Sequence, residues 1–137
     1  MARSLGDPLS TRPQIKPNPV ITNGNMASNI TSTPTILSNV TCASYSLSWT
    51  GTAPVGTASV QASNDYSLNA EGQVLNAGTW NTLTLEYGGA AVTTIPVTGS
   101  PGSLFIDIEK TGAYAIRLVY TSTSGTGTLN ALVVGKV

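Results

Sequence analysis

Residues 103–136 read SLFIDIEKTGAYAIRLVYTSTSGTGTLNALVVGK, which is three apolar runs separated by two short polar breaks. Within each run apolar side chains alternate with their neighbours, over residues 104–108, 114–120 and 129–133. A period of two, together with many β-branched and aromatic residues, is typical of β-strands. Both breaks contain glycine, which tight hairpin turns need. We therefore expect the C-terminal third to form a three-stranded antiparallel meander, with one face covered by the rest of the chain.

Further alternating runs precede this stretch, at residues 30–37, 41–49, 57–63, 80–86 and 92–97. In the run 41–49, serines alternate with larger apolar residues such as Tyr45 and Trp49, as in a strand with one buried face. No stretch has the 3.6-residue period of an amphipathic helix. About eight short strands, with turn signals every eight to twelve residues, predict an all-β fold, an antiparallel β-sandwich or jelly roll.

Residues 1–28 differ from the remainder of the chain. They contain four of the eight prolines, no aromatic residue and no regular period, and three basic residues against one acid give them a net charge of +2. Such a segment cannot bury enough apolar surface to fold alone, and its prolines favour extended backbone. We predict an extended N-terminal arm over residues 1–28 and one β-sandwich domain over residues 29–137. A disordered tail is the alternative for this segment.

The composition indicates the kind of partner. Charged residues make up only 9% of the chain, and no Lys or Arg lies between Lys16 and Lys110. A surface so poor in charge suits a chain that packs against copies of itself or another protein. It lacks the basic stripe of a nucleic-acid binder, and no apolar run reaches the length of a membrane span. The arm residues that we expect to contact neighbouring subunits are Arg3, Arg12, Ile15, Lys16, Pro17, Pro19 and Ile21.

The sequence offers little for catalysis. The chain has no histidine, and its single cysteine, Cys42, has no basic partner nearby in the sequence, so Ser–His and Cys–His nucleophile systems and structural zinc sites are not expected. Asp107 and Glu109 lie two residues apart on a strand, where acids ordinarily keep the surface soluble. We expect no catalytic residue, no cofactor and no metal ion.

The longest irregular connection, residues 64–78, is where a ligand is most expected, because long loops in compact domains are often functional. Oxygen side chains alternate between Asp65 and Glu71 as in a calcium loop, but the glycine and the final bidentate Glu are misplaced, which favours an ordinary polar loop. Tyr66 and Tyr87 lie in loops, so we assign them, with Trp80, as candidates for a partner or glycan surface.

Four segments carry a resemblance: Ser48-Trp49-Thr50-Gly51-Thr52, Ser59-Val60-Gln61-Ala62-Ser63-Asn64-Asp65-Tyr66, Gly78-Thr79-Trp80-Asn81-Thr82-Leu83 and residues 116–131. Over residues 40–136 the chain resembles small β-sandwich proteins encoded by tailed bacteriophages, in which similar segments recur in similar order. The tryptophans also resemble those of discoidin-like jelly rolls, but the loop residues that would bind sugar there have no match here. The resemblance implies a virion component and brings no catalytic residue with it.

These observations together predict a non-enzymatic structural protein of a phage particle, a capsid decoration or cement protein. Its expected partners are copies of itself, as a homo-oligomer, and other virion proteins such as the major capsid protein. The start of the sequence has no apolar secretory region, so we expect production in the host cytoplasm and a final location in the virion. The alternative is a fibre or adhesin module that binds a host glycan.

Overall fold

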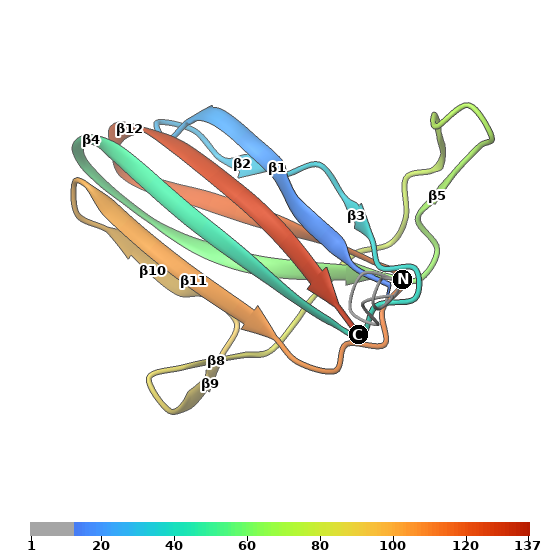
Figure 1. Cartoon of the computed structure of the whole chain (residues 1–137). Helices are drawn as coiled ribbons and strands as arrows, with labels where there is room; N and C mark the ends of the chain where they lie inside the picture. Colours follow the sequence, from blue (N-terminus) through green and yellow to red (C-terminus); the bar gives the residue numbers. More distant parts are fainter. Residues whose placement is uncertain (1–12) are drawn as a thin grey trace, which may run out of the picture.

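The computed structural model describes residues 13–137 and is built from β-strands throughout (Figure 1). The pairings between its strands are all antiparallel. The arrangement is an antiparallel β-sandwich, which confirms the all-β class predicted from the sequence. Residues 13–137 contain no helix long and apolar enough to span a membrane.

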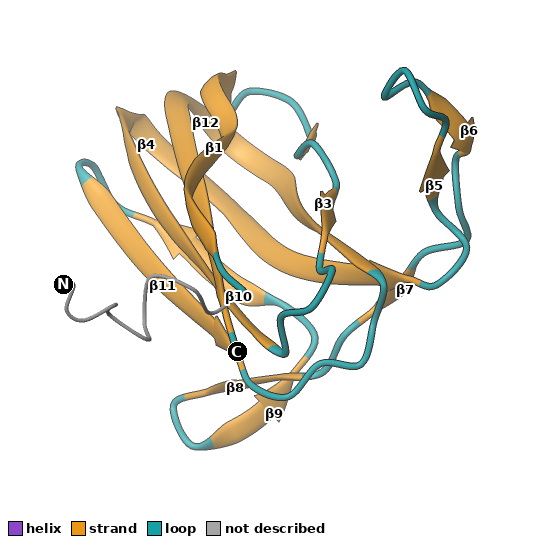
Figure 2. Cartoon of the chain, turned by 45° about the vertical axis from the view of Figure 1, so that its right-hand side comes forward, coloured by secondary structure: helices purple, strands orange, loops and turns teal. Residues whose placement is uncertain are grey.

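Two long strands run through the whole sandwich. Strands β4 (Cys42–Ser63) and β12 (Ala115–Lys136) are 22 residues each and pair along their full lengths, from Ser63 with Ala115 to Cys42 with Lys136. Their register shifts between Ser122 and Thr126, where both strands bend. Each strand therefore crosses from one layer of the sandwich to the other, and both layers share the same two central strands (Figures 1 and 2).

The shorter strands complete the two layers. In the first layer, β1 (Ile15–Asn25) pairs with the C-terminal half of β12, and β11 (Gly102–Ile108) pairs with the N-terminal half of β4. In the second, β2 (Ile30–Thr31) and β3 (Thr35–Ile36) flank β12. On the other side of that layer, β7 (Asn81–Thr82) and β10 (Ile95–Thr98) pair with the C-terminal half of β4.

Two small hairpins project from this framework (Figure 2). One joins β5 (Ser67–Leu68) to β6 (Val74–Asn76), and the other joins β8 (Leu85–Tyr87) to β9 (Ala90–Val92). Neither hairpin pairs with the main sheet in the described part of the chain.

The core lies between the layers and is formed by alternate residues of the long strands. The side chains that point inward from them are almost fully buried: Tyr45, Leu47, Trp49 and Val60 on β4, and Ile116, Leu118, Tyr120, Leu129, Ala131 and Val133 on β12. The serines of residues 44–48 alternate outward, as the sequence predicts. The indole N–H of Trp49 donates to the carbonyl oxygen of Gly99 at 2.9 Å and so ties β4 to the turn before β11.

The predicted C-terminal meander is wrong. Residues 123–127 do not form a hairpin turn but the bend inside β12, and residues 51–54 form the matching bend inside β4. Strand β11 pairs with β4 rather than with β12. The glycines mark a change of backbone direction in both cases, and Gly125 has the positive φ of 79° that a turn would also require. The sequence signal is therefore the same for a turn and for a bend.

The predicted arm is also wrong over the residues that the structure describes. Strand β1 is an integral edge strand, and its Val20 and Ile21 are buried in the core. Pro17 and Pro19 are compatible with this position because an edge strand needs only one row of its backbone hydrogen bonds. The predicted boundary between arm and sandwich domain, at residue 28, therefore falls inside the sandwich. Residues 1–12 lie outside the described part of the chain.

Candidate functional site

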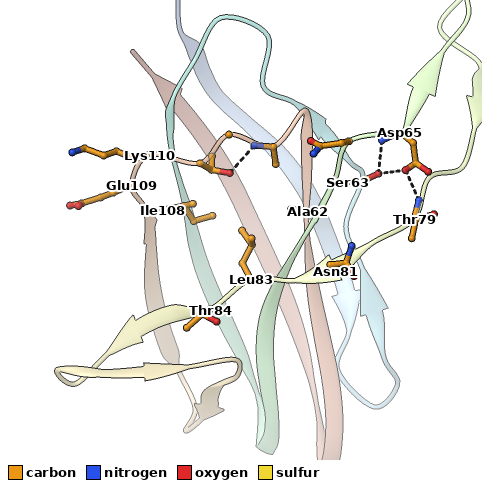
Figure 3. A pocket seen from close by; sticks show the side chains of 14 residues that line it. Ala62, Ser63, Asp65, Thr79, Asn81, Leu83, Thr84, Ile108, Glu109 and Lys110 are labelled. Atoms are coloured by element: carbon orange, nitrogen blue, oxygen red, sulfur yellow. Dashed lines mark hydrogen bonds between the residues drawn. The ribbon is translucent and has the colours of Figure 1, made fainter.

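A groove of about 660 Å³ lies at one end of the sandwich (Figure 3). One side is formed by the end of β4 and the residues after it, and the other by the connection that leaves β11 at Ile108. The polar side chains along it are mostly amides, hydroxyls and acids: Asn64, Asp65, Thr79, Asn81, Thr84 and Glu109. The groove thus combines hydrogen-bonding side chains with an apolar lining that includes Leu83 and Ile108.

Asp65 closes the base of the loop 64–79. One of its carboxylate oxygens accepts hydrogen bonds from the backbone N–H of Thr79 at 2.7 Å and from the Ser63 hydroxyl at 2.8 Å. The Ser63 oxygen also accepts the N–H of Tyr66 at 3.2 Å. The N–H of Thr79, and after it the Ser63 hydroxyl, hold the pKa of Asp65 below its ordinary value. Asp65 is therefore an ionised acceptor that fixes the loop and is poorly suited to proton transfer.

The opposite side of the groove is held by hydrogen bonds that backbone N–H groups donate. The N–H of Thr111 donates to the carbonyl oxygen of Thr41 at 3.0 Å, and the N–H of Tyr114 donates to the amide oxygen of Asn64 at 2.9 Å. Figure 3 shows the Glu109 side chain directed away from Asp65. These two carboxylates do not converge on a common point, so the groove offers no acid–base pair.

A second cluster fixes the loop onto the outer face of the second layer. The guanidinium of Arg117, on β12, lies over the ring of Trp80 and its Nε donates to the side-chain oxygen of Gln61 at 2.8 Å. The Trp80 and Tyr66 rings are 5.6 Å apart at an angle of 52°. Desolvation in this cluster lowers the pKa of Arg117. The sequence does not reveal this cluster, because Trp80 reaches Arg117 only when the loop has folded back.

The structure separates the two candidate tyrosines. Tyr66 is only 7% exposed because its ring packs against Trp80, so its assignment to a partner surface is wrong. Tyr87 lies on the other hairpin and is 45% exposed, which leaves it accessible. The two residues do not form one surface.

The arm residues also divide into two groups. Ile21 is buried and Ile15 is half-buried against the core, so Ile21 is not available to a partner. Lys16, Pro17 and Pro19 are exposed along β1. Arg3 and Arg12 lie outside the described residues.

The oxygens of the calcium-like loop do not converge. The side-chain oxygen of Asn69 accepts the N–H groups of Glu71 and Gln73, at 3.0 and 2.9 Å, within its own hairpin. Asp65 is turned instead toward Thr79. Over residues 13–137 no three His, Cys, Asp or Glu side chains group in a way that could hold a metal ion. The oxygens of Asn69 and Asp65 hold turns, as in an ordinary polar loop.

Comparison with protein-family models and with curated proteins found no match to this chain. Among solved structures, the sandwich is similar to the crystal structure of the SPBc2 prophage-derived protein YomS, with a TM-score of 0.54 and 10% sequence identity. The match covers 89% of this chain and 95% of the other. At this identity the likeness shows that the two proteins share a fold.

Proposed function

We propose that this chain is a non-enzymatic structural protein of a phage particle, with decoration or cementing of the capsid as its role. The observation that carries the proposal is the hairpin β5–β6, which projects from the sandwich and exposes Leu68, Val74 and Leu75, the last to 72%. Isolated two-stranded hairpins are marginally stable in water. A projecting hairpin with neighbouring apolar side chains at its surface suits a chain that packs against a larger assembly.

Three further observations support the proposal. The chain is unusually poor in charge, at 9%, which suits extensive protein contacts. The carboxylates that line the groove point away from one another, and one oxygen of Asp65 accepts two hydrogen bonds that fix a loop. The fold is that of a prophage-derived protein, an analogy that raises the expectation of a phage origin without determining the role.

The test is incorporation into particles. The tagged chain is produced in host cells that make particles of a phage from which the gene for this chain has been deleted. The particles are then purified by density gradient. We expect the chain to co-purify at a fixed copy number, and the Leu75→Ser variant to be depleted at least several-fold. Ala70→Ser, at the exposed tip of the same hairpin, is the matched control and should behave as the wild type. A chain found only in the particle-free fractions would overturn the proposal.

Of the arm predicted over residues 1–28, we propose that residues 1–12 reach neighbouring subunits. Their contribution is tested by removing these residues alone, since a longer deletion would remove β1 and its buried Val20 and Ile21. If the contact exists, the shortened chain stays folded but binds particles more weakly. Unchanged binding would show that the sandwich makes the contact by itself.

Glycan binding is the second candidate, favoured by the amide and hydroxyl lining of the groove. Asn81 and Thr84 are exposed there and could donate to sugar hydroxyls. A glycan array with the wild type and with Asn81→Ala tests this function. A signal that Asn81→Ala removes would support the fibre or adhesin role, and an empty array would rule the groove out for the glycans tested.

A further inference from the structure

Strand β11 has an open and regular edge. Its seven residues pair with β4 in unbroken register, from Gly102 with Trp49 to Ile108 with Ala43, and among the described residues β4 is its sole strand partner. Figure 2 shows β11 at the border of the first layer. The opposite border, β1, contains Pro17 and has three register shifts, which interrupt any further pairing. The two borders of this layer therefore differ in their capacity to accept another strand.

The side chains of β11 give this edge little protection. Ser103, Phe105 and Asp107 point outward, and Phe105, at the middle of the strand, is 63% exposed. On the inward side Leu104 is only half-buried. Natural proteins usually protect a free edge with proline, charged side chains or a bulge, and of these β11 has only the single charge of Asp107, near its end. A straight apolar edge of this kind indicates that another strand covers it.

We propose that β11 pairs with β11 of a second copy of this chain, antiparallel about a two-fold axis at Phe105. The Phe105 rings of the two copies then lie side by side, and Ser103 of each copy lies opposite Asp107 of the other. On the inward side, Leu104 lies opposite Ile106 of the second copy. The first layers of both sandwiches join into one continuous sheet.

Charge and backbone chemistry favour this register over those centred on Asp107 and on Leu104. In it each Asp107 carboxylate faces a Ser103 hydroxyl that can donate to it, and the cross-strand aromatic pair stabilises the centre. Moving the axis to Asp107 places the two carboxylates opposite one another, which is unfavourable. Moving it to Leu104 places Asp107 opposite Pro101, which has no N–H to donate. A two-fold axis midway between two residues would place the outward side chains of one copy beside the inward side chains of the other.

This pairing is the contact between copies of the chain in the proposed structural role. Its biological purpose rests on that role. The contact itself is a property of the chain and can be measured on purified protein. A dimer that is absent from particles would leave the pairing standing and overturn the proposed function. The opposite result is that particles contain the chain, while the purified chain stays monomeric and gives none of the cross-links described below. That result would leave the proposed function standing and overturn the pairing.

The first test is the mass in solution, by sedimentation equilibrium of the full chain. We expect a dimer, and we expect Phe105→Glu to weaken it at least tenfold because it places two carboxylates opposite each other. Leu132→Glu is the matched control, since Leu132 is exposed on the same outer face but lies on β12, away from the edge. Circular dichroism verifies that both variants are folded. Equal dimerisation of the Phe105→Glu and Leu132→Glu variants would overturn the proposal.

The second test reads the register, with Cys42→Ser as the background. Opposite residues of an antiparallel pair have Cα atoms about 4.5–5.5 Å apart, within the range that a disulfide bridges. Under mild oxidation Phe105→Cys should cross-link to itself. Ser103→Cys should cross-link in a mixture with Asp107→Cys but not alone. Cross-links in another pattern, or loss of the dimer on removal of residues 1–12 alone, would show that a different segment covers the edge.

Discussion

The guanidinium carbon of Arg117 lies 4.3 Å from the centroid of the Trp80 ring, and this contact fastens the loop 64–79 to the outer face of the second layer. Arg117 is at the same time paired with Gln61 on the neighbouring strand. The loop is thus anchored at Trp80 and closed at its base by Asp65, which explains how a long connection can keep a defined shape.

The Arg117–Trp80 contact is predicted to stabilise the loop rather than the whole sandwich. Replacing either residue by Ala should increase hydrogen exchange in residues 66–78, and a double-mutant cycle should give a coupling of about 0.5–1 kcal/mol. Exchange in β12 beyond the bend serves as the internal control. Equal increases in both regions would contradict a local role.

Asp65 is predicted to make the stability of the chain depend on acid pH. Because its pKa is lower in the folded chain than in the unfolded one, its contribution is complete above the unfolded value of about 3.9 and is lost as the pH falls through the folded value. Thermal melts of the wild type and of Asp65→Asn between pH 6 and pH 2 measure this. The difference between them should shrink toward low pH, and a constant difference would exclude this origin.

Tyr45 is predicted to cause alkaline destabilisation. Its ring is fully buried, its hydroxyl has no hydrogen-bond partner among residues 13–137, and burial raises its pKa above the ordinary value of about 10. The unfolded chain therefore loses this proton first, so stability falls as the pH rises above about 10. Tyr45→Phe should be neutral or stabilising at pH 7 and should reduce the loss at pH 11 in urea titrations.

A steeper loss at pH 11 in Tyr45→Phe than in the wild type would contradict this assignment. Tyr45→Ala is a useful comparison, because it removes the ring as well and should destabilise the chain by about 3–5 kcal/mol at neutral pH.

Gly125 is predicted to be essential to the bend of β12. Its φ is 79°, and a Cβ there would collide with the backbone carbonyl of Ala53 in the facing bend of β4. Gly72→Ala is the matched control, since Gly72 has a φ of 82° and open space around it. We expect Gly72→Ala to lower the free energy of unfolding by about 1–2 kcal/mol and Gly125→Ala by clearly more. Equal effects in urea titrations would show that the bend can adapt.

The sequence predicts the local structure better than its connections. The inward face of residues 41–49 is correct because a period of two specifies which side chains are buried. The period does not specify which strands pair, so the assignment of β11 to a meander with β12 fails. In β1 the register shift between Pro19 and Ile21 makes the consecutive residues Val20 and Ile21 both buried, which removes the alternation that would have revealed a strand.

The candidate site was predicted only in part. Of the loop 64–78, Asn64 and Asp65 line the groove, and ligand binding by this loop stays a prediction. The burial of Tyr66, however, depends on Trp80 returning to it from the far end of that loop, and no local pattern contains this information. The other side of the groove comes from residues 108–113, which are distant in sequence and are brought close by the pairing of β11 with one end of β4 and of Ala115 with Ser63 at the other end.

The sharing of β4 and β12 between both layers has a consequence for how the chain acquires its structure. Since Cys42 pairs with Lys136 and Ser63 with Ala115, neither layer can close before residues 115–136 have been synthesised. Contacts so distant in sequence make folding slow, because the entropy of closing long loops is lost before the contacts form. The nascent chain therefore holds its apolar strand faces uncovered during most of translation, and its yield in cells should depend on chaperones and temperature more than its final stability would indicate.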